Sequence, residues 1–171
     1  MENSNKPVQK KFAKYLPMSG FPQKRGTALQ ISIVKIKDSD NVRLFAEFAP
    51  QVKDKPPSGS TESPFSWEQK IFIALKEEEV GKLLSVFRGR LKSAEIIHKF
   101  PIDAPKDKQK ISTLIIAENE YNGVLNWKFG LSQKVGTAEA MYLQVYLQPE
   151  DVEILVVMLQ ECIKKMYRLD A

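Results

Sequence analysis

Cationic and aromatic side chains alternate along segments of the sequence where a β-strand would place them on one face. Arg43 and Phe45 are two residues apart, and so are Lys70 and Phe72. Because side chains two residues apart in a strand point to the same side of a sheet, each pair presents a positive charge beside a ring. This combination suits unpaired bases on a phosphate backbone, where each stacked base contributes roughly 1 to 3 kcal/mol.

Later segments repeat this association of polar, cationic and aromatic groups. Asn126 alternates with Lys128, while Tyr142, Gln144 and Tyr146 form one row. Further cations flank the first expected strand, so the candidate binding residues are Lys24, Arg25, Lys35, Arg43, Phe45, Lys70, Phe72, Lys128, Tyr142 and Tyr146. For any single ring in this set, packing inside the protein is an equally good explanation.

Motifs of the common catalytic and metal-binding classes are absent from the sequence. It has no GxxxxGK[ST] phosphate loop, no GxSxG nucleophile elbow and no HExxH zinc motif. One histidine, His98, and one cysteine, Cys162, leave no cluster with metal-ligand spacing. We interpret His98 as a structural side chain and Cys162 as an inert buried thiol. We therefore expect no enzyme activity, no metal site and no cofactor.

Positive charge is concentrated at the N-terminal end of the 171-residue chain. The formal net charge is +5, but residues 1–37 contain eight Lys and Arg residues against one Glu. Clustered cations suit a polyanion, because counterion release drives such binding, although a solvated tail explains the charge equally well. Proline, glycine and lysine crowd residues 1–26, which predicts a flexible basic arm followed by one domain over residues 27–171.

Hydrophobic residues make up 43% of the chain, which is enough for a packed core. The longest apolar run, residues 154–159, is far shorter than the roughly 20 residues that cross a bilayer. The opening residues lack the apolar centre of a secretory signal. We expect no membrane contact and a cytoplasmic or nucleoid-associated protein, with an organellar location left open.

Hydrophobic patterns divide the chain into two blocks of strands, each closed by a helix. Strands are expected at 28–37, 42–49, 67–75, 94–100, 110–118, 124–133 and 141–148, with helices from about 77 to 88 and from 149 to 169. Residues 51–64 predict a mobile loop, and Asn122-Gly123 predicts a tight hairpin turn. Trp67 and Trp127 fall on the apolar sides of their strands, so we expect both in the core.

The two blocks predict an α+β fold built as a pseudo-repeat, in which an antiparallel sheet is followed by a helix. The helix at 149–169 is apolar around most of its circumference. Such width indicates burial on a second side. Another subunit could provide it, or both sheets could wrap the helix within one chain.

Four short strings of the sequence, at residues 24–29, 48–50, 67–70 and 95–98, resemble in their order those of the Whirly single-stranded DNA-binding proteins, which are similar in fold to guide-RNA-binding proteins and to positive cofactor four. Residues 24–29, KRGTAL, resemble the family's Lys-Gly-Lys-Ala-Ala-Leu motif, and residues 48–50 repeat its Phe-Ala-Pro. Trp67 with Lys70 matches a Trp-x-x-Lys strand, and residues 95–98 resemble its Glu-Phe-Phe-His strand. The resemblance covers residues 24–169.

This resemblance implies two antiparallel sheets packed roughly perpendicular, each followed by a helix. It also implies a homotetramer held together through the helices, especially residues 149–169, with single strands bound between neighbouring subunits. We therefore expect binding of single-stranded DNA, with RNA left open as a ligand, little sequence specificity and a role in DNA maintenance or transcription. The alternative from the residues alone is a protein–protein interaction module whose basic arm is incidental.

Overall fold

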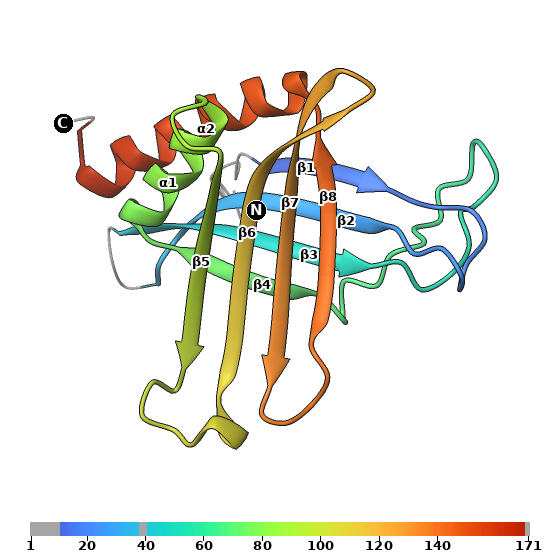
Figure 1. The fold of residues 1–171 in the computed structure, drawn as a ribbon, viewed down its shortest axis with the longest axis horizontal. Helices are drawn as coiled ribbons and strands as arrows, with labels where there is room; N and C mark the ends of the chain where they lie inside the picture. Colours follow the sequence, from blue (N-terminus) through green and yellow to red (C-terminus); the bar gives the residue numbers. More distant parts are fainter. Residues whose placement is uncertain (1–10, 38–40, 170–171) are drawn as a thin grey trace, which may run out of the picture.

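Two four-stranded antiparallel sheets, each followed by a helix, make up the protein, as a computed structural model shows for residues 11–37 and 41–169 (Figure 1). The first sheet has the strand order β1-β2-β3-β4 and the second the order β5-β6-β7-β8. The elements are β1 (Lys11–Leu16), β2 (Thr27–Lys35), β3 (Val42–Pro50), β4 (Ile71–Leu75), α1 (Glu77–Phe87), β5 (Ser93–Phe100), β6 (Lys110–Tyr121), β7 (Val124–Val135), β8 (Met141–Leu147) and α2 (Pro149–Tyr167), with a 3-10 turn at Lys106–Lys108. The predicted α+β pseudo-repeat is confirmed.

One hydrophobic core joins both sheets and both helices. Phe48 of β3 packs against Phe129 of β7, with ring centroids 5.6 Å apart. Phe87 at the end of α1 meets Trp127 of β7 edge-on at 6.4 Å, and Trp127 is buried as predicted. Strands of the second sheet run across those of the first, and the two helices lie together on one side of the crossing (Figure 1). The sheets are therefore held as one unit.

Regular structure begins earlier than the expected Thr27. Strand β1 pairs with β2 along its whole length, from Lys11 opposite Ser32 to Leu16 opposite Thr27. Phe12 is buried in the core, and the Lys14 ammonium bonds Asp151 at the start of α2 at 2.6 Å. Residues 1–10 of the predicted basic arm lie outside the described residues.

The third expected strand is shorter than predicted. Strand β4 begins at Ile71, whereas residues 67–70 form a turn. Trp67 is therefore half-buried, and it packs against a small cluster of Ala28, Ala49 and Phe65 rather than in the main core. The prediction that Trp67 is a core residue is wrong, because the alternation that supported it extends beyond the strand.

Local turn and capping chemistry agrees with the sequence. Asn122 and Gly123 connect β6 to β7 with φ angles of 52° and 74°, the left-handed conformations that a two-residue hairpin turn requires. Helix α1 begins where the Lys76 N–H donates to Glu79 Oε2 at 2.8 Å, which satisfies one of the free donors at a helix start. Among the described residues, no helix is long and apolar enough to cross a membrane.

Candidate nucleic-acid interface

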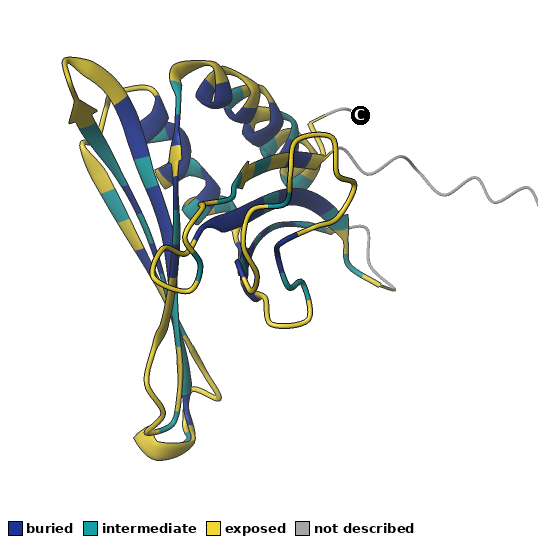
Figure 2. Cartoon of the chain, turned by 90° about the vertical axis from the view of Figure 1, so that its right-hand side faces the viewer, coloured by how far each residue is buried: buried dark blue, intermediate teal, exposed yellow. Residues whose placement is uncertain are grey.

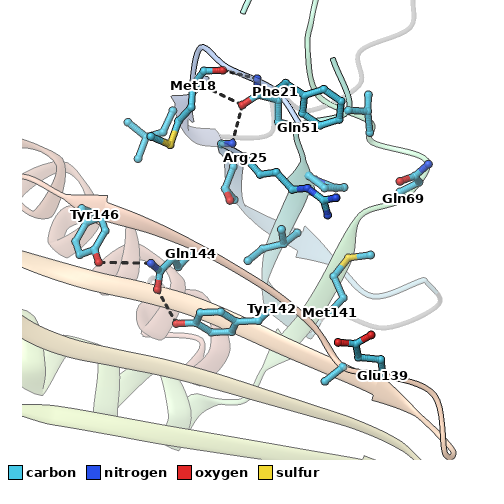
Figure 3. A pocket seen from close by; sticks show the side chains of 17 residues that line it. Met18, Phe21, Arg25, Gln51, Gln69, Glu139, Met141, Tyr142, Gln144 and Tyr146 are labelled. Atoms are coloured by element: carbon cyan, nitrogen blue, oxygen red, sulfur yellow. Dashed lines mark hydrogen bonds between the residues drawn. The ribbon is translucent and has the colours of Figure 1, made fainter. Parts of the chain in front are cut away.

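A groove of about 850 Å³ lies where the tip of the first sheet passes strand β8, and we call it the β8 groove (Figure 3). One wall is formed by the β1–β2 connection and the end of β3, including Arg25 and Gln51. The other wall is β8 itself, with Tyr142, Gln144 and Tyr146. Figure 1 shows β1, β2 and β3 continuing past β8, and Figure 2 shows exposed residues along the loops at this edge of the molecule.

The β8 wall carries a hydrogen-bonded row of side chains, the tyrosine row, made of Tyr142, Gln144 and Tyr146. The Tyr142 hydroxyl donates to Gln144 Oε1 at 2.9 Å, and Gln144 Nε2 donates to the Tyr146 hydroxyl at 3.4 Å. The two tyrosines are 43% and 39% exposed. Their rings are therefore accessible from the groove but tied in place at their polar ends (Figure 3).

Gly130 determines how the first ring of this row lies. It sits on β7 directly opposite Gln144, and the Tyr142 ring extends over it. A Cβ atom at Gly130 would lie 2.6 Å from the Tyr142 hydroxyl oxygen and 3.0 Å from two ring carbons. The missing side chain thus lets the Tyr142 ring lie close to the backbone of the neighbouring strand.

Lys128 brings a positive charge to the same surface. Its ammonium lies 5.6 Å from the centroid of the Tyr142 ring, within the range of a cation–π contact. The register places Lys128 directly opposite Tyr146. A phosphate at Lys128 would therefore bring its attached base within reach of the tyrosine row.

Gln51 holds the opposite wall together. It is buried, and its Oε1 accepts the N–H groups of Gly26 at 2.6 Å and Met18 at 2.9 Å. Its Nε2 donates to the carbonyls of Met18 at 2.6 Å and Lys53 at 2.9 Å. These four bonds close the β1–β2 connection against the end of β3. They fix the backbone next to Arg25, whose exposed side chain reaches into the groove (Figure 3).

A second aromatic group lies on the outer face of the first sheet. The Phe45 and Phe72 rings stack with centroids 6.2 Å apart and planes inclined by 29°. The Lys110 ammonium lies 4.8 Å from the centre of the Phe72 ring. Lys70 forms an ion pair with Glu47, so part of its charge is already compensated.

The structure brings only some of the predicted binding residues together. Arg25, Tyr142 and Tyr146 line the β8 groove, and Lys128 adjoins it. Phe45, Phe72 and Lys70 form the separate group on the outer face. Lys35 pairs across strands with Val42, and Arg43 with Val34, at the opposite end of the first sheet from Arg25. Lys24 is exposed beside Arg25, with its side chain near Gly20.

Two residues that contribute to these surfaces were missed in the sequence. Lys110 begins β6, in a segment read only as a strand, and nothing local indicates that it meets Phe72 of a different sheet. Gln51 begins the stretch that we predicted to be a mobile loop. Residues 52–64 indeed contain no helix or strand. The position of this glutamine directly after Phe-Ala-Pro was the available signal for a structural role. Its four hydrogen bonds could not be predicted, because they depend on how the chain folds back.

Two residues of reactive types, His98 and Cys162, lie outside these surfaces. His98 Nε2 lies 2.7 Å from Glu79 Oε1, which links β5 to the start of α1. Burial raises the pKa of the Cys162 thiol to about 11, so the thiol stays protonated at neutral pH and is a poor nucleophile. Within the described ranges, no group of three or more His, Cys, Asp or Glu residues could hold a metal ion.

The protein thus belongs to the class of α+β folds with two crossed antiparallel sheets, each closed by a helix. Its fold is the Whirly fold, since it matches the structure of WHY1 from Arabidopsis thaliana with a TM-score of 0.67 at 16% identity, over 92% of this chain and 94% of that chain. The plant transcriptional regulator PBF-2 matches with a TM-score of 0.68 at 15% identity, over 95% and 85% of the two chains. Trypanosoma brucei MRP1/MRP2 matches with a TM-score of 0.59 at 13% identity, over 93% of this chain and 94% of that chain. The sequence itself matches no family model and no curated protein.

Proposed function

We propose that the protein binds single-stranded nucleic acid in the β8 groove, with little sequence specificity and without catalysing a reaction. The observation that carries this proposal is the tyrosine row, which presents two accessible rings beside Lys128 and across from Arg25. Rings supply stacking surfaces for any base, and the flanking cations attract the backbone. The Whirly fold, shared with the plant transcriptional regulator PBF-2, supports the proposal of nucleic-acid binding. We favour DNA as the ligand, while stacking and phosphate contacts serve RNA as well.

Binding to an immobilised single strand tests this proposal directly. The purified protein is passed over single-stranded DNA cellulose and eluted with increasing salt. Retention at low salt and elution at elevated salt are expected, because phosphate contacts weaken as salt rises. Flow-through at low salt would contradict the proposal and favour a module that binds proteins instead. Competition with single-stranded RNA and with duplex DNA then ranks the ligands.

The cationic wall of the groove predicts a change in salt dependence. Replacing Arg25 by alanine removes one phosphate contact, so the slope of log affinity against log salt for oligothymidylate should become shallower by about 0.7. Fluorescence anisotropy at several salt concentrations measures it. The matched control is Arg90→Ala, an exposed arginine just after α1. Equal slopes for the two variants would show that Arg25 does not contact the strand.

We also propose that copies of the chain assemble through their helices, especially residues 149–169, into a homotetramer. Two apolar side chains on α2, Ile154 and Val157, are 58% and 61% exposed in the protomer. They lie three residues apart, so they occupy one side of the helix. An exposed apolar surface of this kind is typical of a subunit contact.

Charge substitution on that helix surface should therefore change the mass of the particle. Ile154→Glu with Val157→Glu is expected to give monomers, because two carboxylates would be buried without partners in the contact. Size-exclusion chromatography with light scattering measures the mass. The control pair is Val124→Glu with Leu125→Glu, at an exposed hairpin of the second sheet. If the variant with both substitutions on α2 remains a tetramer, the proposed helix contact is wrong.

A further inference from the structure

We propose that Gln144 contacts the edges of bound bases and that its amide adopts either of two orientations, so that the β8 groove accepts bases of both hydrogen-bonding classes. This inference rests on the proposed function and adds the residue that would make binding tolerant of sequence. Stacking alone leaves the polar edges of a base without partners once water is displaced. Gln144 is placed to supply them.

The position of Gln144 is the first argument. It lies in the middle of the tyrosine row, half-buried, and lines the groove (Figure 3). Its cross-strand neighbour is Gly130, which has no side chain to cover it. The rings of Tyr142 and Tyr146 lie on either side along β8. A base stacked on either ring would therefore have its edge close to the Gln144 amide.

The hydrogen-bonding capacity of the amide is the second argument. A glutamine amide has two N–H donors and two acceptor lone pairs. One lone pair accepts from Tyr142, and one N–H donates to Tyr146. One donor and one acceptor remain for a ligand. Each base likewise presents a donor next to an acceptor on its pairing edge, which makes a two-bond contact possible.

The partners of the amide explain why both classes of base are accepted. Adenine and cytosine carry an amino donor beside a ring acceptor, whereas thymine, uracil and guanine carry a carbonyl acceptor beside a ring N–H. A tyrosine hydroxyl both donates and accepts. If the amide turns by 180°, its Nε2 donates to Tyr142 and its Oε1 accepts from Tyr146, so the number of bonds is unchanged. The amide can thus match either arrangement of donor and acceptor on a base edge while it keeps its hydrogen bonds to both tyrosines.

The test removes the donor from this position. In Gln144→Glu the carboxylate still accepts from both tyrosines, but it has no N–H to offer. It can reach the protruding amino group of cytosine or adenine, whereas the N3–H of thymine lies between two carbonyls that repel it. We expect the ratio of the dissociation constants for oligo-dT and oligo-dC to rise about three- to tenfold over the wild-type ratio, the range of one hydrogen bond.

Gln69→Glu is the matched control, because Gln69 is exposed and lines the same groove. It adds the same negative charge, so it should weaken binding of both oligonucleotides without changing their ratio. Gln144→Leu should weaken binding of both about equally. Circular dichroism is used to check that all three variants are folded. Each affinity is measured by fluorescence anisotropy with oligonucleotides of equal length.

The outcomes separate this inference from the proposed function. Wild-type protein that binds neither oligonucleotide contradicts the proposed function itself. Wild-type binding with an unchanged ratio in Gln144→Glu overturns only the role of Gln144, as does the same change of ratio in Gln69→Glu. A changed ratio confined to Gln144→Glu supports the inference.

Discussion

Replacing Tyr142 and Tyr146 together by leucine is expected to weaken the binding of oligothymidylate by about 30-fold or more. Each ring that stacks on a base contributes roughly 1 to 3 kcal/mol, so two rings contribute at least about 2 kcal/mol. Both side chains are accessible and stand on the surface of β8. Their removal should therefore leave the core intact. Fluorescence anisotropy at fixed salt gives the loss of affinity.

Two controls distinguish stacking from a general disturbance of the second sheet. Tyr142→Phe with Tyr146→Phe keeps both rings and removes only the hydroxyl groups, so most of the affinity should remain. Tyr121→Leu removes an exposed tyrosine at the β6–β7 hairpin, away from the β8 groove, and should bind as the wild type does. If the leucine pair binds like the wild type while folded, bases do not stack on the tyrosine row.

Substitution of Phe48 by alanine should destabilise the fold by about 3 to 5 kcal/mol. This side chain is fully buried and packs on Phe129 across the boundary between the sheets. Truncation loses the transfer free energy of the ring and leaves a cavity that the crossed sheets can close only in part. Urea denaturation followed by circular dichroism measures the free energy of unfolding.

Phe100→Ala is the matched control, because Phe100 is 73% exposed at the end of β5. An exposed site of this kind should change stability by less than about 0.5 kcal/mol. If Phe48→Ala lowers the free energy of unfolding by less than about 1 kcal/mol, well below the range for a buried ring, the two sheets do not share a core. An uncoupled pair of sheets would also leave the β8 groove without fixed walls.

Most of the fold could be predicted because its signals are local. The Asn122-Gly123 turn follows from the φ angles that only such residues adopt readily. The start of α1 follows from the acidic residues at Glu77 and Glu79, one of which caps the helix. Alternation predicted the seven strands other than β1 because one face of each sheet is buried.

The errors occur where pairing with a distant segment decides the structure. Strand β1 lies among lysines and prolines, and it becomes a strand because β2 offers it an edge. Trp67 fits the alternation of β4, yet the chain turns before Ile71 and leaves this ring outside the main core. Neither feature has a signal in its own neighbourhood.

In the candidate interface too, local features were predicted and features that depend on tertiary structure were not. The period of two placed Tyr142 and Tyr146 on one face, as the structure confirms. It did not show that Arg25 would lie across the groove from them, because that arrangement depends on how the sheets cross. Nor did it show that Arg43 lies away from the β8 groove, since the register places this residue at the far end of the first sheet. Composition identified the kinds of side chain, and tertiary structure grouped them.

Photochemical crosslinking tests the proposed interface most directly. An oligothymidylate that carries 5-iodouracil in place of some thymines is irradiated in complex with the full chain, and the modified residues are identified by mass spectrometry. We expect crosslinks at Tyr142 or Tyr146, because excited iodouracil reacts with rings on which it stacks. Efficient crosslinks confined to Phe45 and Phe72, or to residues outside the β8 groove, would contradict this account.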